Sequence, residues 1–256
     1  MAEVTVGIVV IGNEILSGKV TDTNSAFLAR GLREVGGDLC RITVVPDEID
    51  DVVEVIRDFT KRFDVVLTSG GIGPTHDDIT IAAVARALGR RVIRHPTIEQ
   101  GLRRFFKDNV NSAHLKMAEV PEGAELIQGG EVKFPVVKVE NVYLLPGIPQ
   151  ILEDKFHVIK QRFTGTRYHL KTVYSSKGES VIAEHLDATL ARFPGLLLGS
   201  YPRLGDPEYR VKVTLESRDQ AYVEQAFAHL VGILPEGTVV RTEEGGSPVV
   251  ERRDER

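Results

Sequence analysis

A glycine-rich loop followed by two adjacent aspartates stands in the stretch DVVLTSGGIGPTHDDIT, residues 64–80. Glycine takes backbone conformations that are closed to other residues, so Gly70, Gly71 and Gly73 let a ligand lie against bare main-chain amides. A helical pattern resumes near Ile79, and a helix N-terminus adds unpaired N–H groups and a partial positive charge. The stretch therefore predicts a loop that binds an anion such as phosphate.

Asp77 and Asp78 place negative charge at the same loop, which would repel a bare phosphate unless a cation lies between them. Paired carboxylates with His76 nearby suit Mg²⁺ or Mn²⁺, and an imidazole also tolerates Co²⁺. The alternative is that Thr75, Asp77 or Asp78 caps the helix, which stabilises it by about 1 kcal/mol. Both interpretations stay open, since one aspartate can cap the helix while its neighbour binds the metal.

The loop matches neither of two common phosphate-binding motifs. A dinucleotide-binding G-x-G-x-x-G needs a glycine three residues beyond Gly73, where His76 stands. The stretch GNEILSGKVT resembles a P-loop, but its glycines are separated by five residues and Val20 follows Lys19. A P-loop requires four residues there and a Ser or Thr after the lysine, so a kinase or GTPase is disfavoured.

Polar residues also follow two other predicted strands. Gly12, Asn13 and Glu14 follow or end the apolar run VTVGIVVIG, and Asp47 follows the run LCRITVV. Because loops at the carboxyl ends of parallel strands share one edge of the sheet, these residues are expected near the glycine loop. Helix capping is the leading interpretation of the polar residues ahead of the first long helix, which are Asp22, Thr23 and Asn24.

The elements that position these residues alternate between strand and helix over residues 1–166. Buried-strand runs rich in Val and Ile are separated by segments of helical period, which predicts an α/β domain with a mostly parallel sheet. Over residues 167–243 the order becomes βαββαβ, that of a ferredoxin-like α+β domain. Residues 244–256 are charged and contain Gly, Ser and Pro, so a disordered tail is expected.

Composition limits the classes of partner and compartment. The net charge of -5 argues against binding to nucleic acid or to an anionic membrane. No apolar run approaches the roughly 20 residues of a membrane span. The single cysteine, Cys40, lies in a predicted strand, where a small buried residue in a reducing compartment is expected. We therefore expect a cytoplasmic protein.

Three stretches together resemble one known family. GNEILSGKVTDTNSAFLARGL, LTSGGIGPTHDDIT and VYLLPGIP are similar, in this order, to the N-terminal domain of the CinA (competence/damage-inducible protein A) family, a branch of the molybdopterin-binding domain superfamily. The second region, with the stretch LGSYP, resembles the region after this domain in the CinA group and in the N-terminal half of eukaryotic FAD synthase. The resemblance implies a MogA-like three-layer α/β/α domain followed by a smaller ferredoxin-like domain.

The resemblance also implies an activity and a set of site residues. CinA relatives are linked to metal-dependent pyrophosphatase activity on ADP-ribose, the FAD synthase relative to FAD hydrolysis, and family members to homo-oligomers. A nucleotide or pterin ligand is implied, with Mg²⁺, Mn²⁺ or Co²⁺ and with K⁺ as a further candidate ion. Ser69, Pro74 and Thr75 join the loop as ligand-binding candidates. The residues that match the family's motifs are Glu14, Asp22, Asn24, Asp47, Gly70, Gly71, Gly73, Asp77, Asp78, Thr80, Pro146 and Gly147.

Two departures separate the sequence from CinA proper. It ends where many CinA proteins continue into an amidase domain acting on nicotinamide mononucleotide, so that activity is not expected. The segment EVKFPVVKVENVYLLPG replaces a glycine-rich segment of CinA proteins and resembles the FAD synthase relative. The second departure weakens ADP-ribose as the expected substrate.

Together these observations predict a metal-dependent nucleotide pyrophosphatase, a hydrolase that cleaves ADP-ribose or FAD to AMP and a phosphorylated product. Asp78, with Asp77 or Glu14, is expected to hold the divalent ion, with His76 as a further ligand. The amides of the glycine loop are expected to hold the phosphate oxygens. The alternatives are a module that binds molybdopterin or a nucleotide without turnover, and adenylyl transfer in molybdenum-cofactor biosynthesis.

Overall fold

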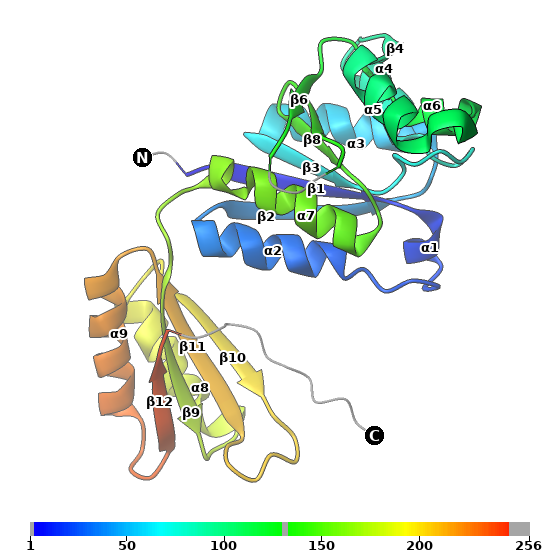
Figure 1. Ribbon diagram of the computed structural model, residues 1–256. Helices are drawn as coiled ribbons and strands as arrows, with labels where there is room; N and C mark the ends of the chain where they lie inside the picture. The colour runs from blue at the N-terminus through cyan, green and yellow to red at the C-terminus, as the bar shows by residue number, and fades with distance from the viewer. Residues whose placement is uncertain (1–2, 130–132, 246–256) are drawn as a thin grey trace. The chain divides into compact units, whose positions relative to one another are not determined.

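The computed structural model describes residues 3–129 and 133–245. The chain divides into two compact units, residues 1–166 and residues 167–256, and each contains its own sheet (Figure 1). The start of the segment EVKFPVVKVENVYLLPG falls in residues 130–132, and most of the predicted tail falls in residues 246–256; both stretches lie outside the described residues.

The first unit is built on a six-stranded sheet in the order β2-β1-β3-β8-β7-β6. Strands β2, β1, β3 and β8 run parallel, while β7 is antiparallel to both of its neighbours. The sheet is therefore mostly parallel, as predicted. Its strands are β1 (Thr5–Ile11), β2 (Asp38–Val45), β3 (Val65–Ser69), β6 (Glu125–Ile127), β7 (Val136–Val139) and β8 (Val142–Leu145).

Helices cover both faces of this sheet and produce three layers. Alternate residues of β1 belong to two hydrophobic cores, one on each face of the sheet. Val6, Ile8 and Val10 pack in the first core, and Val9 and Ile11 pack in the second. The first core is closed by α2 (Asn24–Val35), α7 (Pro149–Ile159) and the 3₁₀ turn Lys160–Phe163. The second is closed by α3 (Ile49–Arg62) and α4 (Thr80–Ala87). The predicted α/β/α architecture is therefore confirmed. It was predicted from the continuous apolar sequence of the strands, which is typical of strands that are buried on both faces.

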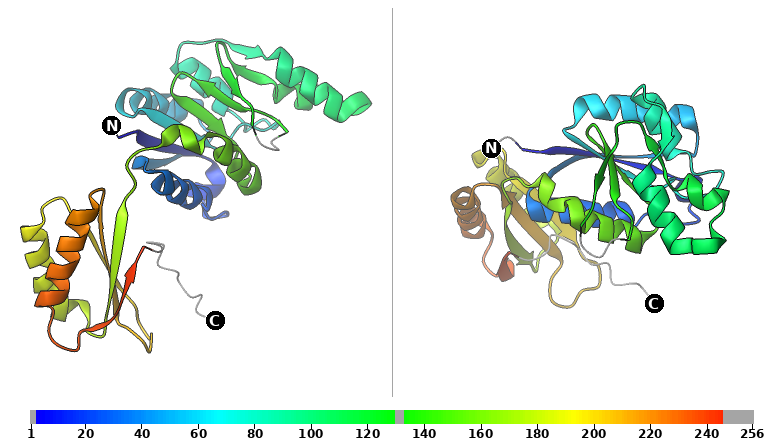
Figure 2. Two further views of the ribbon diagram at one scale, coloured as in Figure 1. Left: turned by 60° about the vertical axis from the view of Figure 1, so that its left-hand side comes forward. Right: turned by 45° about the horizontal axis from the view of Figure 1, so that its top comes forward.

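A segment between α4 and β6 forms a separate small layer beside α4 (Figures 1 and 2). Its core consists of Ile98, Leu102, Ala118 and Val120, all buried. The sequence pattern predicted no elements here. They are β4 (Val92–Arg94), α5 (Pro96–Phe106), the 3₁₀ turn Lys107–Asn109, α6 (Ser112–Lys116) and β5 (Glu119–Pro121), which pairs antiparallel with β4.

The second unit has the predicted βαββαβ order. Its four strands lie in the order β10-β11-β9-β12, and each adjacent pair is antiparallel, which is the ferredoxin-like arrangement and confirms the fold class. The last strand ends at Glu244, one residue beyond the predicted domain end. The elements are β9 (His169–Ser175), α8 (Glu179–Arg192), β10 (Leu197–Pro202), β11 (Val211–Ser217), α9 (Gln220–Ile233) and β12 (Val239–Glu244).

Strand β2 lies at the edge of the first sheet, and this position corrects one expectation. Cys40 is exposed, whereas the sequence predicted a buried residue. An edge strand is covered less completely than a central one, so the side chains in the middle of β2 meet solvent although β1 next to it is buried. None of the helices formed by the described residues has the length and apolarity that crossing a membrane requires.

Candidate functional site

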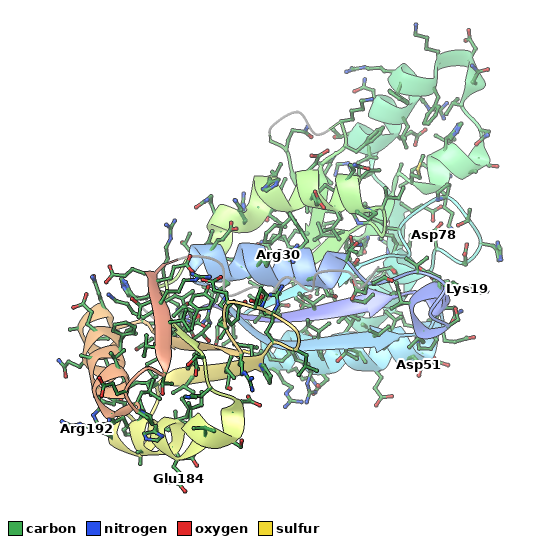
Figure 3. The ribbon with its side chains drawn as sticks, turned by 90° about the horizontal axis from the view of Figure 1, so that it is seen from below. Lys19, Arg30, Asp51, Asp78, Glu184 and Arg192 are labelled. Atoms are coloured by element: carbon green, nitrogen blue, oxygen red, sulfur yellow. The ribbon has the colours of Figure 1, made fainter. Side chains whose placement is uncertain are left out.

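The glycine loop leaves β3 at Ser69 and crosses the carboxyl end of the parallel strands. Gly70 and Gly71 have φ of 106° and 64°, conformations that favour glycine. Their lack of side chains is also required by space, since a Cβ on Gly70 would lie 2.2 Å from the Ile11 carbonyl oxygen and one on Gly71 would lie 2.3 Å from Thr80 Oγ1. Figure 3 places Asp78, at the far end of the loop, at this end of the sheet.

The hydrogen bonds of the loop show which amides remain for a ligand. The Gly70 amide donates to the Leu145 carbonyl at 3.2 Å, and the Gly73 amide donates to Asp78 at 2.6 Å. Within residues 3–129 and 133–245, the amides of Gly71 and Ile72 donate to no partner. The anion site predicted for the whole loop is therefore narrowed to these two amides.

Asp78 closes the loop through both of its carboxylate oxygens. Oδ1 accepts from the Gly73 amide at 2.6 Å, and Oδ2 accepts from the Thr75 amide at 2.7 Å and the Thr75 hydroxyl at 2.5 Å. Lys116 of α6 holds the same turn by donating to the carbonyls of Thr75 and Asp78. These bonds favour a structural role for Asp78, as the capping interpretation did. The amides that Asp78 accepts from lie in the loop ahead of α4, however, and not in the first turn of the helix.

The side chains of His76 and Asp77, between Thr75 and Asp78 of the loop, are exposed. Their side chains are 98% and 60% exposed, and His76 Nδ1 lies 4.0 Å from Asp77 Oδ1. The neighbouring Thr75 hydroxyl and the local backbone hold the pKa of Asp77 below its ordinary value, so this carboxyl is ionised at neutral pH. Among the described residues, no three His, Cys, Asp or Glu side chains form a group that could hold a metal ion by themselves.

The loops after β1 and β2 meet as the parallel topology predicts. The Asn13 amide donates to Asp47 Oδ2 at 2.8 Å, which ties the start of α1 (Asn13–Leu16) to the loop after β2. The Glu14 carboxylate folds back over Gly12, where a Cβ would lie 2.5 Å from Glu14 Oε1. Glu14 and Asp47 both line the same cavity as the glycine loop.

Asn24, at the start of α2, joins three parts of the chain. Its amide Nδ2 donates to Ser69 Oγ at 3.0 Å and to the Gly147 carbonyl at 2.8 Å, while its Oδ1 is buried without a described partner. Asp22 accepts from the Ser25 amide at 2.9 Å, so Asp22 satisfies one free amide in the first turn of α2 although Thr23 occupies the cap position. The bonds of Asn24 make it a positioning residue that fixes the glycine loop against the loop after β8.

Two adjoining cavities collect most of the predicted site residues. The larger has a volume of about 470 Å³, and we call it the chamber; the predicted residues that line it are Glu14, Asp47, Gly70, Gly71, Gly73, Pro74, Asp77, Asp78, Pro146 and Gly147. A second cavity of about 80 Å³ shares Glu14, Gly70 and Gly147 with it and is also lined by Asp22, Asn24 and Ser69. The predicted residues that line neither cavity are Gly12, Asn13, Thr75, His76 and Thr80.

Thr80 nevertheless has a defined role in holding the loop. Its hydroxyl donates to the Gly70 carbonyl at 2.9 Å, and its amide donates to the Gly71 carbonyl at 3.0 Å. The first turn of α4 is thus bonded to the carbonyl side of the loop. The amide sides of Gly71 and Ile72 are left for a ligand.

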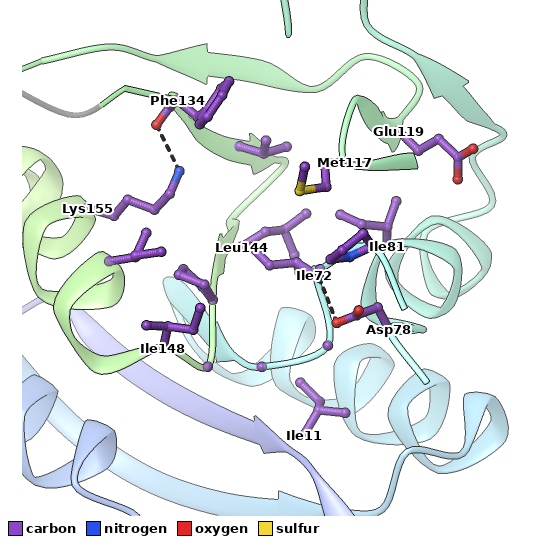
Figure 4. A pocket seen from close by; sticks show the side chains of 18 of the residues that line it. Ile11, Ile72, Asp78, Ile81, Met117, Glu119, Phe134, Leu144, Ile148 and Lys155 are labelled. Atoms are coloured by element: carbon purple, nitrogen blue, oxygen red, sulfur yellow. Dashed lines mark hydrogen bonds between the residues drawn. The ribbon is translucent and has the colours of Figure 1, made fainter. Parts of the chain in front are cut away.

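Lys155 is a chamber residue that the sequence did not indicate. It lies on α7, is 7% exposed, and donates to the Phe134 carbonyl at 3.0 Å (Figure 4) and to the Pro135 carbonyl at 2.5 Å. Burial lowers its pKa from 10.5 to about 8. The spacing of Leu152, Phe156 and Ile159 on the buried face of α7 was the available signal, since position 155 falls on the same face.

Comparison with known proteins identifies the family. Residues 7–165 match the family described as a probable molybdopterin-binding domain, and residues 167–243 match the middle domain of FAD synthase. A protein of Archaeoglobus fulgidus is 35% identical over 227 residues, covering 89% of this chain and 96% of that protein.

Two further relatives carry descriptive names. A probable FAD synthase of Caenorhabditis briggsae is 32% identical over 248 residues; the match covers 86% of this chain and 47% of the FAD synthase, so the chain spans about half of that protein. The crystal structure of CinA from Thermoplasma acidophilum aligns with a TM-score of 0.58 at 27% identity, covering 63% of this chain and 98% of that chain. The resemblance to CinA and FAD synthase is thereby confirmed. With its first unit matched almost from end to end, the chain belongs to the probable molybdopterin-binding domain family.

Proposed function

We propose that the first unit hydrolyses the diphosphate of an ADP-containing molecule, such as FAD or ADP-ribose, to AMP and a phosphorylated product. The observation that carries the proposal is the placement of two kinds of group on one chamber: the loop of Gly71 and Ile72, whose amides are unpaired within the described chain, and the carboxylates of Glu14 and Asp77. Amides suit the phosphate oxygens, and carboxylates suit a cation that accompanies a diphosphate. The match of the second unit to FAD synthase supports FAD as a substrate to test.

The donor set fits a divalent ion that arrives with the nucleotide. Mg²⁺ is usually held by one or two carboxylates, water and substrate phosphates, and does not need a cage of protein ligands. Of the three carboxylates that the sequence predicted to hold the ion, Glu14 and Asp77 are available for this, because both oxygens of Asp78 already accept hydrogen bonds from the loop. When bound, such an ion would neutralise charge on the diphosphate and lower the pKa of an attacking water.

The residues of the chain have separate tasks in this mechanism. The amides of Gly71 and Ile72 orient the non-bridging phosphate oxygens and stabilise the charge that develops on them. Asp78 and Thr80 keep these amides in place through their bonds to the loop. Asn24 fixes the loop against Gly147, so that the two sides of the site keep their spacing.

The second candidate function is binding of a nucleotide or pterin without turnover. It is favoured by one observation, namely that residues 7–165 match a family described by binding, as a probable molybdopterin-binding domain. Both functions use the same chamber. They differ in whether product is formed.

The test is product analysis by chromatography. The purified protein is incubated with FAD, ADP-ribose, NAD or ATP, each with Mg²⁺, Mn²⁺ or Co²⁺ and with K⁺. We expect AMP from FAD or ADP-ribose, and a loss of about a hundredfold in rate in Glu14→Gln and Asp77→Asn. Glu54→Gln, an exposed carboxylate on α3, serves as the control and is expected to retain the full rate. Absence of AMP with every substrate, together with ligand-induced thermal stabilisation, would instead establish the binding module.

A further inference from the structure

Lys155 is a buried amine on the wall of the chamber that the proposed mechanism does not use. Its side chain is 7% exposed and lines the chamber, and Figure 4 shows its nitrogen beside the Phe134 carbonyl. Much of the chamber wall is apolar. The apolar side chains labelled in the same view, apart from Ile11, are Ile72, Ile81, Met117, Phe134, Leu144 and Ile148.

These surroundings favour the neutral form of the Lys155 amine. Both of its described acceptors are backbone carbonyls, and burial is the cause that lowers its pKa to about 8. At pH 8 about half of this amine is therefore neutral, against about 0.3% of an ordinary lysine with a pKa of 10.5. A lysine that is desolvated in this way is a nucleophile, because its lone pair is free to react.

The two carbonyls also determine where the lone pair lies. A lysine ammonium has three N–H donors, and the carbonyls of Phe134 and Pro135 accept two of them. The third proton is the one that is lost when the amine becomes neutral, so the lone pair takes the third direction. Because Lys155 lines the chamber, this direction is the one left for a ligand there.

The other groups of the chamber indicate what such a ligand contains. The amides of Gly71 and Ile72 suit a phosphate, and the Glu119 carboxylate lines the chamber as an acceptor for hydroxyl groups. A neutral amine reacts reversibly with an aldehyde. A molecule that joins a phosphate, hydroxyl groups and an aldehyde is a phosphorylated aldose, and a cavity of about 470 Å³ has room for it.

We propose that Lys155 is a nucleophile that forms an imine with the open-chain aldehyde of a phosphorylated aldose whose phosphate is held by the glycine loop. The inference rests on the proposed function in one respect, since the same amides hold phosphate in both. It also extends that function, because cleavage of ADP-ribose to AMP leaves ribose 5-phosphate, which is a phosphorylated aldose. The aldose produced by the first reaction is thereby retained on the protein.

The step balances without an oxidant or a reductant. The lone pair of Lys155 Nζ forms a bond to the aldehyde carbon, and the π electrons of the C=O bond move to its oxygen. That oxygen leaves as water with one hydrogen from Nζ and one proton from solvent, which yields a protonated imine. The nitrogen keeps one N–H for a backbone carbonyl, and hydrolysis reverses the step.

The test traps the imine by reduction. The full-length protein is incubated at pH 8 with ribose 5-phosphate and cyanoborohydride, which delivers a hydride to the imine carbon and leaves a stable secondary amine. Mass spectrometry of the digested protein then measures the adduct at each lysine. Ribose, which lacks the phosphate, is the comparison ligand. Lys160→Met is the control variant, since Lys160 is five residues further along the chain and absent from the chamber lining.

We expect Lys155 to be modified at least about tenfold faster than Lys160, because more of its amine is neutral although a less basic amine is a weaker nucleophile. Ribose should react at Lys155 at least about tenfold more slowly than ribose 5-phosphate, since it lacks the charged group that the amides hold. Lys155→Met should lose the rapid modification, and Lys160→Met should keep it.

The proposal is overturned if Lys155 is modified no faster than Lys160, or if ribose reacts there as fast as ribose 5-phosphate. Should Lys155→Met fail to fold by circular dichroism, the ratio of the two adducts within the unchanged protein decides. Failure of the proposed function gives a different result. An adduct at Lys155 without AMP release from any nucleotide would remove the pyrophosphatase and keep the imine, whereas AMP release without this adduct would do the reverse.

Discussion

At the scale of single residues, the two neighbouring aspartates of the loop have different surroundings. Asp78 accepts three hydrogen bonds from Gly73 and Thr75, whereas the Asp77 side chain is 60% exposed. The same residue type therefore supports the loop at one position and is exposed at the edge of the chamber at the next. Substitution at the two positions should separate loop stability from catalysis.

For Asp78→Asn we expect a lower free energy of unfolding, by about 1–3 kcal/mol, because an amide replaces one of the two accepting oxygens by a donor. Asp77→Asn should unfold like the unchanged protein and lose only turnover. Urea denaturation followed by circular dichroism measures the difference. Equal stability of both variants would contradict the role assigned to Asp78.

Lys155 gives a second prediction at this scale, on the dependence of stability on pH. Its pKa is about 8 in the folded protein against an ordinary 10.5, so between these values the unfolded chain binds more protons. The free energy of unfolding should therefore rise as pH increases from about 8, by on the order of 2 to 3 kcal/mol once pH passes 10. Below pH 8 the full cost of the buried charge is present.

The measurement compares the unchanged protein with Lys155→Met in denaturant unfolding from pH 7 to 10. Lys212 of the second unit, whose pKa is also lowered by burial, is present in both proteins, so its titration cancels in the difference. Parallel curves for the two proteins would show that Lys155 is not titrating in this range.

At the scale of elements, close contact between α2 and α7 depends on one glycine. A Cβ on Gly31 would lie 2.4 Å from Phe156 Cε1, and Phe156 is fully buried. The helices approach at this point because residue 31 has no side chain. Even a single methyl group at residue 31 is therefore expected to disturb the contact between α2 and α7.

We expect Gly31→Ala to destabilise the first unit by about 1–3 kcal/mol, since Phe156 has no space into which to move. Gly101→Ala is the matched control, because it also lies inside a helix of this unit but its Cβ would be 3.8 Å from Phe134. That variant should gain about 0.5–1 kcal/mol from helix propensity. Thermal unfolding of both variants gives the comparison, and a neutral Gly31→Ala would show that α2 and α7 can separate.

Elements with long periodic patterns were predictable, and the remainder required tertiary context. The buried stripe of Leu28, Leu32 and Val35 defines α2, and continuous apolar runs define β1 and β3. By contrast β4 and β5 have three residues each, too few to show a period. The carbonyls that accept from the buried Lys155 belong to Phe134 and Pro135, about twenty residues away in sequence, and a lysine in an amphipathic helix is ordinarily expected at the surface.

At the scale of the whole molecule, each unit contains a core of its own. The first has cores on both faces of its sheet, and the second packs α8 and α9 on its antiparallel sheet. Separate cores are the usual condition for independent folding. The division at Thr166 therefore defines a fragment that can be tested.

The fragment 1–166 is expected to fold alone and to keep the activity proposed for the first unit, because every described residue that lines the chamber precedes residue 166. Circular dichroism measures its folding, and release of AMP from FAD or ADP-ribose measures its activity. A fragment that is unfolded, or folded but without the activity of the full chain, would show that the second unit contributes to the first.

Cys40, which is exposed on the edge strand β2, provides a site at which the protein can be labelled with a thiol-reactive reagent. The sequence contains one cysteine, so a maleimide fluorophore attaches to a single defined atom of the first unit without any engineered site. Partial burial and the nearby Asp38 carboxylate raise the pKa of this thiol, and labelling should accordingly accelerate as pH increases from 7 to 9. A dye placed there, paired with a second at a chosen position after residue 166, would report the distance between the two units in solution.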